Sequence, residues 1–348
     1  MTALTMPARP KRDARPRPVP WRRMAWVTWR QHRAALGGVA VFLGAFAVYL
    51  WLTGLQMHHA EAAYCHPASS LGCAINFTGR YGETAILVSI ALQAVPALIG
   101  AFIGAPVLAR ELETGTFRYA WTQGVGRLRW TLGKLVPLAV AVTAMAGAFT
   151  VLFAWYDQPW VAAGYVTQFS ARVFGLLGVA FAAWTLAAFA IGVLAGMLIR
   201  RAVPAIAATL AAYAVLAFAT GLWLRERYIT PLVTRNPNPP GSAWAISGWY
   251  TKGGRYAFGD RGNAISSTVR RLCGGPCGTV RQICSGTCHG PGPGSPEQLL
   301  AQHGYTHWIS YQPASRFWPF QWIEGGWLLA LSVLLIAATV WLVRRRAA

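Results

Sequence analysis

Six cysteines and one histidine carry the most reactive side chains of this chain. The cysteines are Cys65, Cys73, Cys273, Cys277, Cys284 and Cys288. The last four form two pairs, each with a gap of three residues, and His289 follows directly, so thiolates and an imidazole could together bind zinc. Zinc sites more commonly have a gap of two residues, and each cysteine-containing segment holds an even number of cysteines. The pattern therefore favours disulfides in an oxidising compartment and leaves their pairing open.

A second group of polar residues follows the apolar stretch that ends at Ala109. Glu111 and Glu113 are two of only 10 acidic residues in the chain, and Gly115 interrupts the helical pattern after them. Thr116 is then placed to cap a short helix, because threonine favours the N-cap position. One face of that helix would carry Phe117, Ala120 and Trp121. Such a helix could fill a groove on a soluble partner or lie among lipid headgroups.

Catalytic motifs are absent from the sequence. The segment nearest to a phosphate-binding loop ends in Gly133-Lys134-Leu135, where the spacing differs and no Ser or Thr follows the lysine. Neither His-Glu-x-x-His nor Gly-x-Ser-x-Gly occurs. We therefore expect no catalytic residues, no metal site and no cofactor in this chain, and any ATP would be bound by a partner subunit.

The composition indicates a membrane protein. Of the 348 residues, 55% are hydrophobic and only 12% are charged, whereas soluble domains carry about 25% charged residues. The formal net charge is nonetheless +21, from 31 Lys and Arg against 10 Asp and Glu. A basic protein can bind nucleic acid, but here the basic residues flank long uncharged runs instead of covering a compact fold. Membrane lipids are therefore the expected partner, and nucleic acid is not.

Six runs contain no Asp, Glu, Lys, Arg or His. A helix of about 20 such residues crosses a hydrocarbon core of ~30 Å, and each run reaches or nearly reaches that length. The runs are Ala34–Leu55, Ala85–Ala109, Leu135–Tyr156, Val173–Ile199, Ala202–Leu224 and Gly325–Val343. The sequence therefore predicts an all-α polytopic membrane protein with six transmembrane helices.

Basic residues are distributed unequally between the two sides of these runs. The short segments 1–33, 110–134, 200–201 and 344–348 together hold 19 Lys and Arg, whereas the short segments on the other side hold only Arg80 and Arg172. The positive-inside rule then predicts that both termini are cytoplasmic and that all six cysteines lie on the outer face. The abundance of Ala, Gly, Arg and Trp over Lys suggests a GC-rich bacterial genome, so we expect a multi-pass protein of the bacterial cell membrane.

The chain divides into five parts on this basis. They are a disordered, Pro-rich basic tail (1–20), an amphipathic interfacial helix (21–33), helices one to five with a cytoplasmic coupling loop at 109–134 (34–224), an extracytoplasmic loop domain (225–324), and the sixth helix with a basic tail (325–348). The outer segment is rich in Gly and Pro, which favour turns, so we expect a large irregular loop. It could gate a substrate, bind an external partner or only cover the helix ends.

Small and weakly polar residues replace charges within the runs. Gly100 and Gly104 in the second run, and Gly192 and Gly196 in the fourth, could each bring helices together, although the motif does not identify the partner helix. Several polar residues are expected to form hydrogen bonds between helices rather than to contact a substrate. They are Ser89, Gln93, Thr143, Thr185 and Thr209.

The segment after the second run resembles the signature of the type-2 class of ABC transporter permeases. In that class a Glu-rich stretch and Gly-Thr lead from the second span into a cytoplasmic coupling helix, and a basic residue and Gly-Lys open the third span. The matching residues are Glu111, Glu113, Gly115, Thr116, Arg129, Gly133 and Lys134. The basic segment 21–33, the six spans, the large outer loop and the segment 311–324 are also similar to bacterial members, whereas the Pro-rich tail and the outer cysteines depart from the pattern.

The resemblance implies the membrane subunit of an ATP-driven exporter. A cytoplasmic ABC ATPase subunit would bind the loop from Arg110 to Arg129, and a second permease, either a copy or a paralogue, would complete the pathway. The implied coupling residues are Glu111, Glu113, Gly115, Thr116, Phe117 and Trp121. Uncharged spans suit a hydrophobic or amphipathic compound that needs no fixed charge in the bilayer.

A different class of protein is also consistent with the outer cysteines. A polytopic sensor or scaffold could bind a metal or haem in a Cys/His cap, because Cys284, Cys288 and His289 resemble a haem attachment site with one residue too many. Visible absorbance or stoichiometric zinc in the purified protein would favour this alternative.

Overall fold

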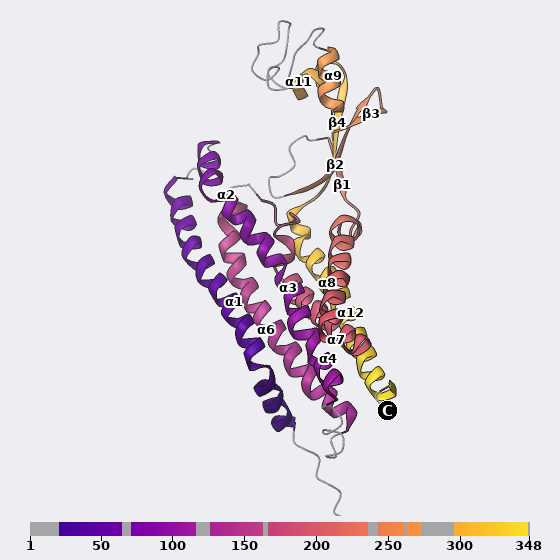
Figure 1. Ribbon diagram of the computed structural model, residues 1–348. Coiled ribbons are helices and arrows are strands. Elements are labelled where there is room, and N and C mark those ends of the chain that lie inside the picture. The colour runs from indigo at the N-terminus through magenta and orange to yellow at the C-terminus, as the bar shows by residue number, and fades with distance from the viewer. Residues whose placement is uncertain are drawn as a thin grey trace, which may run out of the picture.

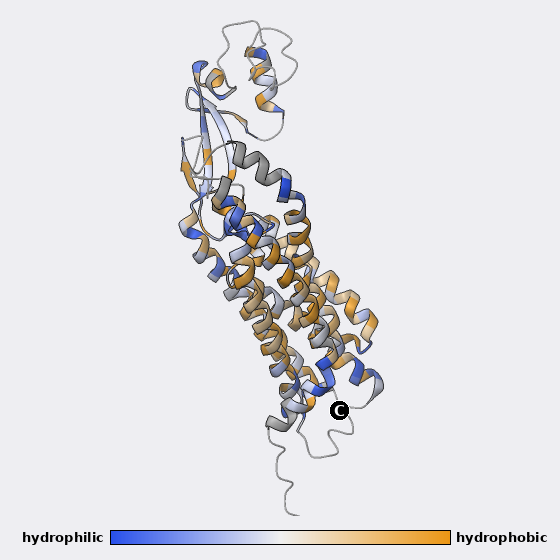
Figure 2. Cartoon of the chain, turned by 90° about the vertical axis from the view of Figure 1, so that its left-hand side faces the viewer, coloured by the Kyte–Doolittle hydropathy of each residue, from blue (hydrophilic) through white to orange (hydrophobic). Residues whose placement is uncertain are grey.

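The computed structural model describes residues 21–64, 71–115, 126–162, 166–235, 243–260, 263–272 and 296–346. This part of the chain contains six helices long and apolar enough to cross a membrane, which confirms the predicted all-α polytopic class. The spans are Leu36–Ala62, Gly79–Thr114, Arg127–Ala162, Ala180–Ile199, Ala202–Arg227 and Ala314–Arg345. They form one elongated bundle (Figure 1), and apolar residues dominate its length while polar residues gather near its ends (Figure 2).

The two ends of the bundle carry different structures. The described chain begins and ends at the same end of the bundle, where α4 (Ala105–Thr114) also ends and α6 (Arg127–Ala162) begins (Figure 1). We call this the basic end, because the basic segments that begin at Arg110, Arg127 and Arg200 also lie there. The opposite end carries a small sheet and is called the sheet end. The structure thus groups at one end the segments that the positive-inside rule places on one side of the membrane.

The first span belongs to one long helix, α1 (Trp21–Tyr64), of 44 residues. It includes residues 21–33, so the structure contains no break between the expected interfacial helix and the first span. At ~1.5 Å per residue this helix measures roughly 66 Å, about twice the ~30 Å hydrocarbon core, and it extends well beyond the span. It packs mainly along α6 (Arg127–Ala162).

The second span is interrupted. The helix α2 (Leu71–Gln93) is followed by α3 (Val95–Ile99), by a π-helical turn (Gly100–Gly104) and by α4 (Ala105–Thr114). Pro96 lies in the first turn of α3, where its missing N–H breaks no hydrogen bond of that helix. Gly115 ends α4 with a left-handed φ of 71°, which glycine adopts at no steric cost.

The centre of the bundle is α7 (Ala180–Ile199), which packs against α3, α4, α6, α8 (Ala202–Ala219) and α12 (Phe317–Arg346). It approaches the second span very closely. A Cβ added to Gly192 would collide with the carbonyl oxygen of Gly100, and one added to Gly104 would lie 2.6 Å from the carbonyl oxygen of Phe189. The two glycine motifs therefore pack against each other, which identifies the partner that the sequence left open.

The fourth span begins later than the sequence predicted. The uncharged run starts at Val173, but α7 starts at Ala180, after an irregular segment that contains a 3₁₀ turn (Phe174–Leu176). Gln321 of α12 explains the boundary, because its Oε1 accepts a hydrogen bond from the Ala180 N–H at 2.9 Å and its Nε2 donates one to the Phe174 carbonyl at 3.0 Å. A side chain from the sixth span thus satisfies backbone groups at the start of the fourth.

The outer segment is not irregular where the structure describes it, so that expectation was wrong for these residues. It forms an antiparallel four-stranded sheet in the order β1-β4-β2-β3. The strands are β1 (Leu232–Thr234), β2 (Trp244–Lys252), β3 (Arg255–Gly259) and β4 (Tyr305–Gln312). Gly253 and Gly254, with φ of 56° and 79°, form the two-residue turn between β2 and β3, as type I′ hairpins require.

Two short helices cover the far part of this sheet. They are α9 (Ala264–Leu272) and α11 (Pro296–Gln302). Their Val269, Leu299 and Leu300 form a small core with Tyr250 of β2. The chain enters this region through a π-helical turn (Thr220–Leu224) and a 3₁₀ turn (Arg225–Arg227) after α8, and leaves it through a 3₁₀ turn (Ala314–Arg316) before α12.

Most of the weakly polar span residues do not join helices, contrary to the prediction. Ser89, Thr185 and Thr209 each donate a hydrogen bond to a carbonyl four residues earlier in their own helix, at 2.8, 2.7 and 2.6 Å. The buried hydroxyl of Thr143 has no hydrogen-bond partner among the described residues. A hydroxyl one turn from a carbonyl is satisfied locally, so no second helix is needed.

The glycine contact yields a stability prediction. Gly192→Ala places a methyl group against backbone that cannot rotate away, so we expect it to destabilise the bundle by about 1–3 kcal/mol, as overpacking does. The control is Gly147→Ala in α6, where an added Cβ meets nothing within 4 Å. Thermal unfolding of the purified protein in lipid nanodiscs measures both, and equal midpoints for the two variants would contradict the close packing.

Candidate functional site

At the basic end, Glu111 forms the first of two ion pairs that join spans in the described part of the chain. Its carboxylate accepts a hydrogen bond from the Lys134 ammonium group, which is only 8% exposed. The same ammonium nitrogen lies 4.7 Å from the centre of the Trp130 ring. Because Glu111 belongs to α4 and Lys134 to α6, the pair joins the last turns of the second span to the start of the third.

Glu113 makes a different contact at the same end. Its Oε2 accepts a hydrogen bond from the backbone N–H of Ala202 at 3.2 Å. Ala202 is the first residue of α8, so the carboxylate lies at a helix N-terminus, where unpaired N–H groups and the helix dipole favour a negative charge. Glu111 and Glu113 together connect α4 to α6 and α8.

Further contacts join α1 and α12 to α6 at the basic end. Thr28 of α1 donates a hydrogen bond to the Gly133 carbonyl of α6 at 3.1 Å, and Arg127 of α6 donates one to the Arg344 carbonyl of α12 at 3.2 Å. Burial lowers the pKa of His32, which accordingly adds little positive charge beside Lys134 at neutral pH. The basic end is therefore held by contacts between several spans.

The remaining predicted coupling residues are only partly placed. Gly115 ends α4, as described above, whereas Thr116, Phe117 and Trp121 lie outside the described residues. The structure therefore places the start of the coupling loop and the helix that follows it, at Arg127.

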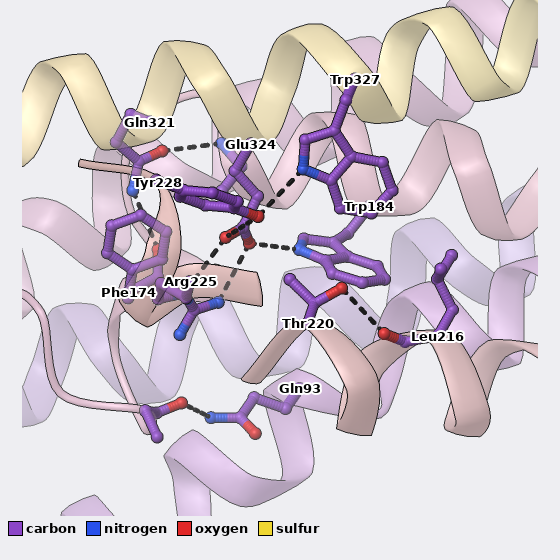
Figure 3. Close-up of polar contacts among 12 residues, drawn as sticks. Gln93, Phe174, Trp184, Leu216, Thr220, Arg225, Tyr228, Gln321, Glu324 and Trp327 are labelled. Carbon is purple, nitrogen blue, oxygen red and sulfur yellow. Dashed lines mark hydrogen bonds and ion pairs between the residues drawn. The ribbon is translucent and has the colours of Figure 1, made fainter. Parts of the chain in front are cut away.

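The second ion pair lies at the sheet end and was not predicted. Glu324 of α12 is fully buried, and its carboxylate accepts hydrogen bonds from Nε and Nη2 of Arg225 at 3.1 and 3.0 Å (Figure 3). Trp184 of α7 donates a third bond to it at 2.8 Å. A buried carboxylate with two contacts from one guanidinium and one from an indole is well compensated for its lost hydration.

Aromatic residues extend this polar cluster. The hydroxyl of Tyr228 lies 3.3 Å from Glu324 Oε2, and the Trp327 indole donates a hydrogen bond to the same hydroxyl at 2.9 Å (Figure 3). Burial raises the pKa of Tyr228, which keeps it neutral beside the carboxylate. The sequence did contain a signal for this ion pair, because Arg225 directly follows the fifth uncharged run and Glu324 directly precedes the sixth.

A cavity of about 340 Å³ opens beside this cluster. Its lining comes from the second, fourth and fifth spans and from the irregular segment before α7, and it is mostly apolar and aromatic with a few polar groups. Representative lining residues are Gln93, Phe181, Trp184, Tyr213, Phe218 and Arg225. Gln93 also donates hydrogen bonds to the carbonyls of Ala171 and Arg172, at 3.0 and 2.7 Å, and so holds the irregular segment in place. Size and lining suit a small amphipathic ligand.

The cysteine prediction is not tested by the described residues. Only the backbone of Cys73 is described, within α2, and the other five cysteines and His289 lie outside that part of the chain. Among the residues that the structure describes, no group of three or more His, Cys, Asp or Glu side chains could hold a metal ion. The disulfides and the alternative metal or haem cap both stay predictions.

Six helices able to span a membrane, with an ion pair between spans at each end of the bundle, define a multi-pass membrane protein. The model of the ABC-2 membrane transporter related family matches residues 40–225, more than half of the chain, and the chain belongs to this family. The match runs from the first span to Arg225 and includes Glu111, Glu113 and Lys134. Neither the curated proteins nor the solved structures gave a match.

The sheet-end ion pair yields a second stability prediction. Glu324→Gln leaves the Arg225 guanidinium buried without a counter-charge, and we expect a loss of about 3–5 kcal/mol in unfolding free energy. The matched control is Glu226→Gln, which neutralises an exposed carboxylate next to Arg225. Unfolding in nanodiscs measures both. The double variant Arg225→Met/Glu324→Leu should recover most of the loss, and a double variant less stable than Glu324→Gln alone would contradict this explanation.

Proposed function

We propose that this permease is the membrane subunit of an ATP-driven ABC exporter in a bacterial cell membrane. A separate cytoplasmic ATPase subunit binds the loop 110–129, hydrolyses ATP and drives the transport of a hydrophobic or amphipathic compound. The observation that carries the proposal is the pair of contacts made by Glu111 and Glu113, which link the end of α4 to α6 and α8. Family membership supports it, and so does the absence of a phosphate-binding loop from the sequence.

The contacts suggest how a movement of the loop reaches the bundle. A push on the loop displaces the end of α4, and α4 carries Glu111 and Glu113, so α6 and α8 move with it. The glycine contact then transmits the movement to α7, because the backbones of the second and fourth spans have no side-chain layer between them. These helices therefore move together, because close-packed interfaces change by discrete shifts rather than by continuous deformation.

The 340 Å³ cavity supports the choice of substrate. Aromatic residues such as Phe181 and Trp184 would hold an apolar body, and Gln93 and Arg225 would contact a polar end. We propose that two permeases, identical or paralogous, form the complete pathway, with lipids around them. No cofactor is assigned to this chain, and ATP is bound by the partner subunit.

The Glu111–Lys134 pair provides a direct test of coupling. Glu111→Ala should abolish export while the protein still inserts in the membrane, because α4 loses its link to α6. The exchange Glu111→Lys/Lys134→Glu restores opposite charges at the same two positions and should recover part of the transport. ATP-dependent efflux from cells, with protein amount measured in the membrane fraction, is the readout. Wild-type efflux by Glu111→Ala would contradict the proposed link.

A second test concerns binding of the ATPase. Trp121→Ala should remove an aromatic anchor from the loop, so the ATPase no longer co-purifies and export stops, although the permease still inserts. The control is Trp223→Ala at the sheet end, where a tryptophan 63% exposed is removed from the opposite side of the bundle. Co-purification from membranes and efflux are measured for both. Normal behaviour of Trp121→Ala would exclude this residue from the coupling loop's function.

A further inference from the structure

A second, smaller cavity lies at the sheet end and is also lined by the segment that Gln93 holds. Its volume is about 130 Å³, and it lies between α2, α6 and the irregular segment before α7. Its lining includes Ser89, Tyr156, Asp157, Trp160 and Arg172. The volume suits a single small headgroup rather than a whole drug-sized compound, since complete ligand pockets begin at about 300 Å³.

Asp157 distinguishes this cavity from an ordinary packing defect. The residue is 5% exposed, and its Oδ2 has no hydrogen-bond partner among the described residues. By contrast, the carboxylates of Glu111 and Glu324 each form an ion pair with a basic side chain. Asp157 is thus a buried acidic group whose counterpart is not supplied by the described protein.

Such a group requires an explanation, because an ionised carboxylate buried without a counter-charge is strongly unfavourable. Ionisable groups at membrane depth usually mark a ligand or ion site. A ligand that brings a positive charge into the cavity would compensate the carboxylate. Ser89 gives no competing contact, since its hydroxyl is donated to the carbonyl of Ala85.

The aromatic lining narrows the choice of cation. Tyr156 and Trp160 border the cavity beside Asp157, and Ile86, Val166 and Val173 complete an apolar wall. Two aromatic rings together with one carboxylate favour an organic ammonium group over a metal ion, because aromatic rings attract an ammonium group but offer no oxygen ligands to a metal. Within the lining, the titratable groups besides Asp157 are Tyr156 and Arg172.

We propose that this cavity binds the ammonium group of an organic cation, with Asp157 as its counter-charge and Tyr156 and Trp160 as aromatic contacts. The assignment of this cation as part of the exported compound rests on the proposed function, whereas binding itself does not. Arg172 is exposed and forms no ion pair with Asp157 in the described structure, so it lies at the cavity as a repelling charge that limits affinity.

The test measures binding to the purified full chain in phosphatidylglycerol nanodiscs, without any ATPase. Choline is the probe, and its neutral carbon isostere, with tert-butyl in place of trimethylammonium, is the matched ligand control. Calorimetric titration should detect choline and not the isostere. Asp157→Asn should weaken choline binding by at least about tenfold, a difference that corresponds to ~1.4 kcal/mol, and should keep the size-exclusion profile of the wild type.

Two further variants sharpen the result. Glu83→Gln neutralises an exposed carboxylate next to Gly82 of the lining and should leave choline binding unchanged. Arg172→Gln removes the repelling charge and should tighten binding. Equal binding of choline and its isostere, or an unchanged affinity in Asp157→Asn, would overturn the proposal. Because no ATPase is present, this outcome is independent of whether the protein transports anything.

The natural ammonium group could belong to a free compound or to a lipid headgroup. Repeating the titration in phosphatidylethanolamine nanodiscs distinguishes the two sources, because the lipid then competes for the site. Weaker choline binding there, with Asp157→Asn again impaired, would assign the site to a lipid headgroup. Equal affinity in the two lipids would assign it to a free organic cation.

Discussion

The cost of burying charge in a medium without water is the constraint on which this structure depends. Hydrocarbon cannot solvate an ammonium or a carboxylate, so a charge buried in the bundle needs an opposite charge beside it. Lys134 pairs with Glu111 at the basic end, and Arg225 pairs with Glu324 at the sheet end. Each pair joins two spans, so compensation of charge also fixes the relative position of helices.

Between these two ends the bundle is held by backbone proximity. Glycines of α7 and of the second span let the two backbones come into direct contact, and this brings a π-helical turn against the central helix. Turns of this type leave the regular helical ladder and often occur at functional sites. A second π-helical turn, Thr220–Leu224, contributes Gly221 and Leu222 to the larger cavity. The irregular turn at the end of the fifth span therefore borders the larger cavity.

Much of the bundle was predictable because its spans are single uncharged runs. The third and sixth spans extend beyond their uncharged runs and include Lys134 and Glu324, whose charges are balanced by residues far away in the sequence. No local sequence pattern reveals such a partner. Arg225 and Glu324 lie 99 positions apart. Glu111 and Glu113 were found as motif residues, but their contacts with α6 and α8 depend on the packing of three helices. The sheet was not predicted because Gly and Pro were counted over the whole outer segment. That average hid β2 and β4, two strands rich in Trp, Tyr, Ile and Thr. The Gly253-Gly254 pair did indicate a hairpin.

The central proposal is that the loop after α4 is the contact site of an ATPase. The most direct measurement is site-specific photo-crosslinking in native membranes, with a photoreactive amino acid at position 117 and, as the control, at position 256 in β3, where Tyr256 is 70% exposed at the sheet end. We expect position 117 to give a covalent adduct with a Walker-motif ATPase, identified by mass spectrometry, and position 256 to give none. The absence of this adduct from position 117 while the ATPase is present, or its formation from position 256, would contradict the proposal.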